Sequence, residues 1–186
     1  MSLPTLTPQN ASALRAAQLQ GHCSGGEQLY ALIDAAHPQA KAALAEAQFQ
    51  TPRLLGLFQG MAEQEAQAAG PYLLALNPAE EIDLARIARL DLAAQQAPCV
   101  SWLWSAARPD ALFAHLQQQL VASLPDGGEA LLRFYDPRVL TQLFAGPGLD
   151  AAQRAELAGP VTRWQWQAPG ARAWVHAHHT TTEEST

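Results

Sequence analysis

The chemically richest stretch of the sequence is residues 132–140, which read LRFYDPRVL. If Asp136 caps a helix that begins at Pro137, the side chains of Arg133, Tyr135, Asp136 and Arg138 gather where a strand meets that helix. An Arg–Asp pair could fix this corner through two parallel hydrogen bonds, or the same groups could face a partner directly. Catalysis by this cluster is not expected, because no nucleophile and no group titrating near neutral pH accompanies it.

Four tryptophans form two W-x-W pairs, Trp102 with Trp104 and Trp164 with Trp166. In a strand, each pair points to one face of the sheet. The pairs could fill the core or form an exposed aromatic surface, since Trp and Arg are favoured anchors of protein interfaces. We interpret Trp102 and Trp104, together with the four polar residues of the LRFYDPRVL stretch, as partner-binding residues.

Asp34 follows a short apolar run, a position where many α/β enzymes hold a functional carboxylate. With His37 or His115 it could serve a small hydrolase, whereas the simpler interpretation is a turn carboxylate satisfied by backbone N–H groups. A small-ligand site caged by Trp102 or Trp164 is a further possibility. We predict no catalytic residue and no enzymatic activity.

Two other groups contain residue types that bind metals or attack substrates. His176, His178 and His179 are closely spaced, but a catalytic metal needs ligands on rigid elements, and this region is predicted to be a solvated tail. Cys23 follows His22 in a glycine-containing loop, and sequence neighbours rarely place an imidazole against a thiolate. We therefore predict no bound metal and no cofactor.

The composition favours one small globular protein. The chain has 186 residues and a net charge of -6, so self-repulsion is weak and a packed core is expected. The sequence is acidic and Lys41 is its only lysine, so it lacks the excess positive charge that binds nucleic acid or an anionic membrane. No long apolar run or secretory signal is present, and the two cysteines lack metal-site spacing, so we expect a reduced, cytoplasmic protein.

Predicted strands and helices alternate along the chain. Strands are expected at residues 29–33, 72–76, 98–104 and 161–167, with a short strand within 52–58 and a hairpin that pairs 119–124 with 129–135 around a Pro-Asp-Gly-Gly turn. The glutamine-rich first arm of this hairpin could instead be helical. Helices are expected at residues 9–20, 37–48, 62–69, 78–92, 108–120, 136–144 and 150–157. This order predicts an α/β fold, a mixed β-sheet with helices packed on it. We divide the chain into an N-terminal helix and loop (1–26), a single α/β domain (27–168) and a flexible tail (169–186).

Several blocks of the sequence occur in one order and spacing. They are YALID at 30–34, LF with Gly60 at 57–60, GPYLLAL at 70–76, the Trp102/Trp104 strand, LPDG at 124–127, RFYDPRVL at 133–140, and GPV with Trp164 at 159–164. In these blocks the sequence resembles the adaptor, or effector-chaperone, family of bacterial type VI secretion, a VgrG-associated domain of unknown function. The strand at 100–104 reads VSWLW, where this family more often has a glycine-containing aromatic strand.

The resemblance implies a cytoplasmic protein with no enzymatic activity. Such adaptors hold a secreted effector protein encoded nearby and help to load it onto the VgrG spike of the secretion apparatus. The resemblance therefore implies an effector as partner, with the VgrG spike or a PAAR tip protein as a possible second partner. It implies no catalytic residue.

Overall fold

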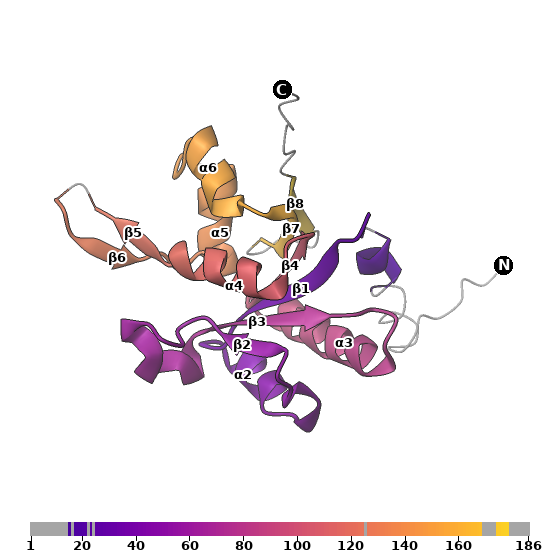
Figure 1. Cartoon of the computed structure of the whole chain (residues 1–186). Helices are drawn as coiled ribbons and strands as arrows, with labels where there is room; N and C mark the ends of the chain where they lie inside the picture. The colour runs from indigo at the N-terminus through magenta and orange to yellow at the C-terminus, as the bar shows by residue number, and fades with distance from the viewer. Residues whose placement is uncertain are drawn as a thin grey trace.

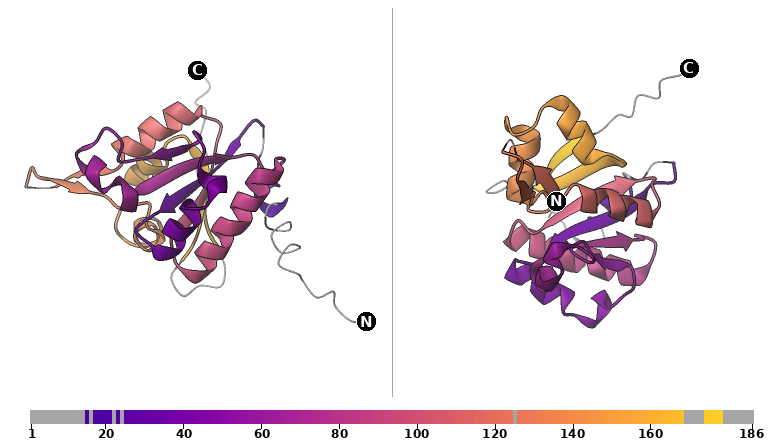
Figure 2. Two further views of the ribbon diagram at one scale, coloured as in Figure 1. Left: turned by 90° about the horizontal axis from the view of Figure 1, so that it is seen from below. Right: turned by 60° about the vertical axis from the view of Figure 1, so that its left-hand side comes forward.

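Strands form the centre of the molecule, and helices lie on both sides of them (Figures 1 and 2). The computed structural model describes residues 15, 17–21, 23, 25–124 and 126–168, and the backbone of residues 174–178. Its strands are β1 (Gln28–Asp34), β2 (Leu54–Gly56), β3 (Pro71–Leu76), β4 (Val100–Ser105), β5 (Val121–Ser123), β6 (Glu129–Leu131), β7 (Val161–Gln167) and β8 (Trp174–His178). Its α-helices are α2 (Pro38–Leu44), α3 (Glu81–Gln96), α4 (Pro109–Gln118), α5 (Pro137–Ala145) and α6 (Ala151–Ala158), and its 3₁₀ helices are η1 (Ala47–Phe49) and η2 (Ala62–Ala69).

The described strands form a six-stranded sheet in the order β2-β3-β1-β4-β7-β8 and a separate β5–β6 hairpin. Each pairing between these strands is antiparallel. Strands β3 and β4 run in the same direction and are joined through α3, but β1 lies between them, so the unit is a split β–α–β. The predicted α/β domain with helices packed on its sheet is confirmed, although the strand directions are not mixed.

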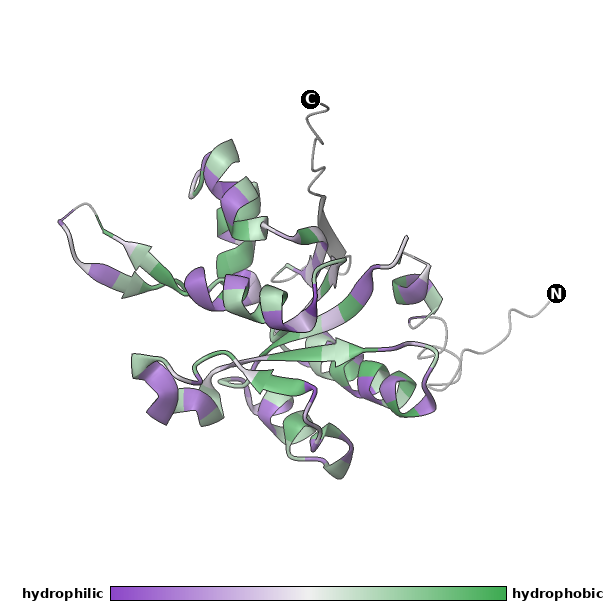
Figure 3. Cartoon of the chain, in the orientation of Figure 1, coloured by the Kyte–Doolittle hydropathy of each residue, from purple (hydrophilic) through white to green (hydrophobic). Residues whose placement is uncertain are grey.

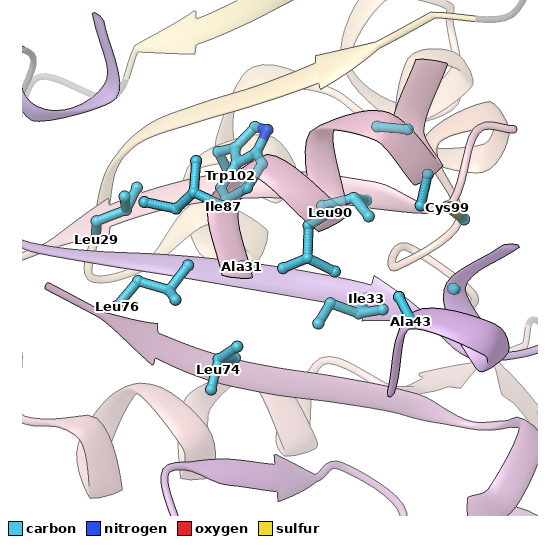
Figure 4. Packing of buried hydrophobic residues seen from close by; sticks show 14 of the residues in the cluster. Leu29, Ala31, Ile33, Ala43, Leu74, Leu76, Ile87, Leu90, Cys99 and Trp102 are labelled. Carbon is cyan, nitrogen blue, oxygen red and sulfur yellow. The ribbon is translucent and has the colours of Figure 1, made fainter. Parts of the chain in front are cut away.

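One face of the sheet packs against α3. The side chains of Leu29, Ala31 and Ile33 project from β1 into a core that Ile87 and Leu90 of α3 complete (Figure 4). The intervening residues of β1 are also buried, because helices cover the opposite face as well. A strand covered on both faces has a continuous apolar sequence, and this explains the apolar run predicted as a strand at 29–33.

The opposite face of the sheet packs against α4, α5 and α6. Tyr30 and Leu32 of β1 point into this second core, which receives Leu112 and Leu116 from α4 and Leu140 from α5. Figure 2 shows α3 and α4 on opposite sides of the sheet. Within the described part of the chain, no helix combines the length and the apolar character needed to cross a bilayer.

The two tryptophan pairs lie in different cores. Trp102 and Trp104 are fully buried on the α3 side, whereas Trp164 and Trp166 are buried on the side of α4 and α5. The spacing therefore predicts correctly that each pair shares a face. The prediction that Trp102 and Trp104 form an exposed binding surface is wrong, because β4 is an interior strand with covering elements on both faces. Trp104 Nε1 donates a hydrogen bond to Leu19 O at 3.1 Å, which ties it to the helical residues 17–20.

Local signals locate most helices but not their type or length. Asp136 caps α5, as predicted, and Asp150 forms a capping box with Gln153 at the start of α6. Residues 62–69 form a 3₁₀ helix, and the helix predicted over 37–48 divides into α2 and η1. Gly159 ends α6 with a φ of 49°, and a Cβ atom there would collide with the His115 ring, so this site needs glycine.

The ends of the chain are described only in part. Residues 9–14 of the predicted first helix lie outside the described residues, while residues 15 and 17–20 are helical. The predicted flexible tail contains strand β8, which pairs with β7 in register from Gln167↔Trp174 to Arg163↔His178. The exposed edge of β7 explains this difference, since an unpaired strand edge offers backbone groups to any neighbouring segment. The closely spaced histidines of this tail have no described side chains.

Candidate functional site

The LRFYDPRVL stretch lies at one end of the sheet, beside the end of β1. Strand β1 ends at Asp34, which pairs with Pro71 at the start of β3, and Asp34 N donates to Cys99 O just before β4. Residues 132–136 lie beside this end of β1, where Arg133 Nη2 is 3.5 Å from Asp34 Oδ2. We call Asp34, Arg133, Tyr135, Asp136 and Arg138 the arginine corner.

The backbone of this stretch is a turn and not the predicted strand. Strand β6 ends at Leu131, after which Phe134 N donates to Leu132 O and Asp136 N donates to Arg133 O. Phe134 and Tyr135 are consequently both buried, whereas an extended strand would place them on opposite faces. The predicted clustering of the polar residues is nevertheless confirmed, because the turn leads directly into α5.

Asp136 is the centre of the corner. Its Oδ1 accepts the Arg138 backbone N–H at 2.9 Å, which caps α5. The Arg138 side chain also binds this carboxylate through Nε at 3.0 Å to Oδ1 and Nη2 at 2.7 Å to Oδ2. This is the bidentate Arg–Asp pair considered from the sequence, and it fixes the Arg138 guanidinium on the buried Asp136 carboxylate. Arg133 Nη2 lies 3.8 Å from the same carboxylate.

Asp34 is fully buried and only partly satisfied. Its Oδ1 accepts the Ala36 backbone N–H at 3.0 Å, as expected for a turn carboxylate. Its Oδ2 accepts no hydrogen bond from the described residues, although the Arg133 guanidinium is nearby. A buried carboxylate oxygen without a donor is costly, so Arg133 supplies charge compensation here in place of a hydrogen bond.

An aromatic ring packs against one of the two arginines, Arg133. The Arg133 guanidinium lies 5.7 Å from the centroid of the Tyr135 ring. Tyr135 makes edge contacts with Phe58 and Phe134, each with ring centroids 6.2 Å apart. Because these rings are buried, they position the charged part of Arg133 without covering it.

The pKa values of the two carboxyl groups of the corner are shifted in opposite directions. Burial raises the pKa of Asp34, and the Ala36 N–H and the Arg133 charge only partly oppose it. Burial also acts on Asp136, but the hydrogen bonds and charge of Arg138, with the charge of Arg133, outweigh it and lower the pKa of that carboxyl. Burial and the nearby Asp34 carboxylate raise the pKa of the Cys99 thiol to about 12, so this cysteine is unsuited to act as a thiolate nucleophile near neutral pH.

Comparison with known proteins adds one finding. The model of the family described as Domain of unknown function (DUF4123) matches residues 29–156. The chain belongs to the DUF4123 family. No curated protein and no solved structure matches it. The matched DUF4123 segment contains every residue of the arginine corner.

Within this DUF4123 domain, the four predicted site residues of the arginine corner fall into two groups. Arg133 and Arg138 have side chains that are 45% and 52% exposed, so both can contact another molecule. Tyr135 and Asp136 are buried beneath them and act as supports. The contact of Asp34 with Arg133 was not predicted from the sequence, which suggested either a hydrolase carboxylate beside a histidine or a turn carboxylate. The YALID block, which ends in Asp34, was the available signal for it.

The hydrolase hypothesis required an imidazole bonded to Asp34. Among the described residues, His37 contacts Asp34 through its backbone, with its N–H donating to Asp34 O at 3.3 Å. The other candidate, His115, lies on α4, and its Nε2 is 3.1 Å from Leu157 O. No carboxylate–imidazole pair of the kind that activates a nucleophile is therefore formed by these residues.

Proposed function

We propose that this DUF4123 domain is an adaptor that binds a secreted effector of a type VI secretion system and helps to load it onto the VgrG spike. Family membership and the order of the sequence blocks support this role. The effector would be encoded nearby, the VgrG spike or a PAAR tip protein would be a second partner, and the complex would form in the cytoplasm. The adaptor would make or break no covalent bond.

One structural observation carries the proposal: two half-exposed guanidinium groups are held on buried carboxylates. Arg138 is fixed by three side-chain hydrogen bonds to Asp136, and Arg133 is held between Asp34, Asp136 and the ring of Tyr135. Side chains that are ordered before binding lose less conformational entropy on contact. Arginine is also among the residues that most often dominate the affinity of an interface.

Such a surface would recognise acceptor groups on the effector. The outer N–H groups of Arg133 and Arg138 could donate to carboxylates or to backbone carbonyl oxygens of the bound protein. Lysine would not reproduce this geometry, because its ammonium cannot bond Asp136 in a bidentate way and still present a planar donor edge.

The test is co-purification with the product of the neighbouring effector gene. We expect Arg138→Ala and Arg133→Ala each to weaken the complex at least about tenfold, measured by titration calorimetry. Arg108→Ala is the matched control, because Arg108 also pairs with an aspartate two residues away, Asp110, but at the exposed start of α4. Unchanged affinity in both corner variants would exclude this surface, and the absence of any complex with the effector would exclude the adaptor role.

A further inference from the structure

The β5–β6 hairpin exposes apolar side chains that the arginine corner does not use. Val121, Leu124 and Leu131 are 43%, 42% and 37% exposed, and they account for three of the five large apolar side chains that are exposed in the described part of the chain. The hairpin projects beyond the body of the fold (Figure 1), and Figure 3 shows hydrophobic colour on part of each of its strands, beside hydrophilic colour. Clustered apolar groups on a projecting element are typical of interaction sites.

The side chains on one face of the hairpin are Val121, Ser123, Glu129 and Leu131. Val121 is paired with Leu131, and Ser123 with Glu129, so each pair places its two side chains on the same side. Next to this face lies a groove of about 240 Å³ between the hairpin and the start of η2. Its lining residues are Met61, Ala62, Glu63, Val121, Glu129, Ala130 and Leu131.

The outer edge of β6 has backbone groups available for pairing. Leu124 N donates to Gly128 O on one side of the ladder, and Leu132 N donates to Leu120 O on the other. Hydrogen-bonded and non-hydrogen-bonded pairs alternate in an antiparallel ladder. The N–H and C=O groups of Glu129 and Leu131 therefore point away from β5, and the described residues provide no further strand beside β6.

The charges around the groove specify what could fill it. Both charged residues of its lining, Glu63 and Glu129, are acidic. We propose that this groove binds an extended segment of a partner protein that carries an apolar side chain and a Lys or Arg side chain two residues apart, so that both lie on the same face of the segment. The segment pairs with the outer edge of β6, inserts an apolar side chain between Met61 and Leu131, and places its cations against Glu63 and Glu129.

This inference can be tested without the effector, so it stands or falls separately from the adaptor role. The probe is a short fluorescein-labelled peptide with Val and Lys in turn at every second position and Ser between them (the Lys/Val peptide), and the comparison peptide has Glu in place of each Lys (the Glu/Val peptide). Fluorescence anisotropy should detect binding of the Lys/Val peptide and markedly weaker binding of the Glu/Val peptide. Amide hydrogen exchange at Glu129 and Leu131 should slow when the Lys/Val peptide binds, because their N–H groups enter the new ladder.

Two sets of variants localise the binding. Glu63→Lys combined with Glu129→Lys should reverse the preference between the two peptides, whereas Glu156→Lys on exposed α6 should leave it unchanged. Leu131→Ser should weaken binding of the Lys/Val peptide at least about tenfold, whereas Leu92→Ser, at an exposed apolar position of α3, should not.

Three results would overturn the proposal. The first is equal binding of the two peptides, or no binding of either. The second is loss of binding in the control variants as large as in the groove variants. The third is a dimer of the wild-type chain, detected by light scattering and abolished by Leu131→Ser, which would assign the hairpin to contact between copies. Circular dichroism of each variant would confirm that the fold is intact.

Discussion

Asp34 and Asp83 are fully buried carboxylates at opposite ends of strand β3, but they are bonded very differently. Asp83 accepts two hydrogen bonds from Arg53, at 2.9 and 3.1 Å, one from Arg86, and one from the Asn77 backbone N–H at 2.7 Å. Both of its oxygens are therefore satisfied. This network joins β3, α3 and the segment before β2 at one end of the sheet.

Asp34, at the other end of β3, accepts far fewer hydrogen bonds than Asp83. It accepts one backbone hydrogen bond, from Ala36, and its second oxygen relies on the charge of half-exposed Arg133. The comparison suggests different roles for the two carboxylates. Asp83 stabilises the fold, while Asp34 holds a surface arginine whose remaining donors are open to solvent or to a partner.

The largest effect should come from breaking the satisfied network. Asp83→Ala leaves Arg86 buried without its carboxylate partner, and we expect the free energy of unfolding to fall by about 3–5 kcal/mol. Urea denaturation near neutral pH measures this loss. A loss below about 1 kcal/mol would show that the network adds little to stability, and the contrast with Asp34 would then disappear.

Asp136→Ala should have an intermediate effect. It removes the cap of α5 and the buried partner of Arg138, and we expect a loss of about 2 kcal/mol in the same measurement. Asp136→Asn keeps the capping oxygen and should lose roughly half as much. Equal losses in the two variants would mean that the charge of Asp136, and not the cap, dominates.

The pH dependence should separate the two carboxylates of the corner. Because the pKa of Asp136 is lowered in the folded state, its stabilisation is complete above the ordinary Asp pKa and is lost as the pH falls through the lowered value. Because the pKa of Asp34 is raised, its contribution is most favourable at low pH and declines as the pH rises from the ordinary Asp pKa through the raised value.

Denaturation of the wild type, Asp34→Asn and Asp136→Asn from about pH 3 to about pH 7 would test these signs. The penalty of Asp136→Asn should grow with pH, while Asp34→Asn should become more favourable relative to the wild type. Each pKa unit of difference between the folded and unfolded states corresponds to about 1.4 kcal/mol. Parallel curves for the two variants would contradict the assignment.

The smallest effect is expected for Asp34→Asn at neutral pH. This variant removes a buried charge that is poorly satisfied, so we expect the free energy of unfolding to change by less than about 1 kcal/mol in either direction. The same measurement on Asp83→Asn should show a clear loss, since that charge has two arginine partners. Similar losses at the two sites would remove the distinction between them.

Some features could be predicted from sequence because they depend on near neighbours. The cap at Asp136, the strand at β1 and the shared face of each W-x-W pair all follow from residues a few positions apart. The predicted strand through Arg133 and Tyr135 failed because hydrophobic alternation cannot distinguish a strand from a turn that buries two adjacent rings. The hairpin was recognised from its turn residues, but its arms were predicted too long.

By itself, the sequence determined the α/β class, the positions of most elements and the gathering of Arg133, Asp136 and Arg138, because local spacing and capping control them. Only the tertiary structure decided that Trp102 and Trp104 are core residues, since burial depends on which elements cover a strand. Only the tertiary structure, too, brought Asp34 beneath Arg133. That contact joins residues far apart in the chain, and its formation depends on how the strand ends pack together.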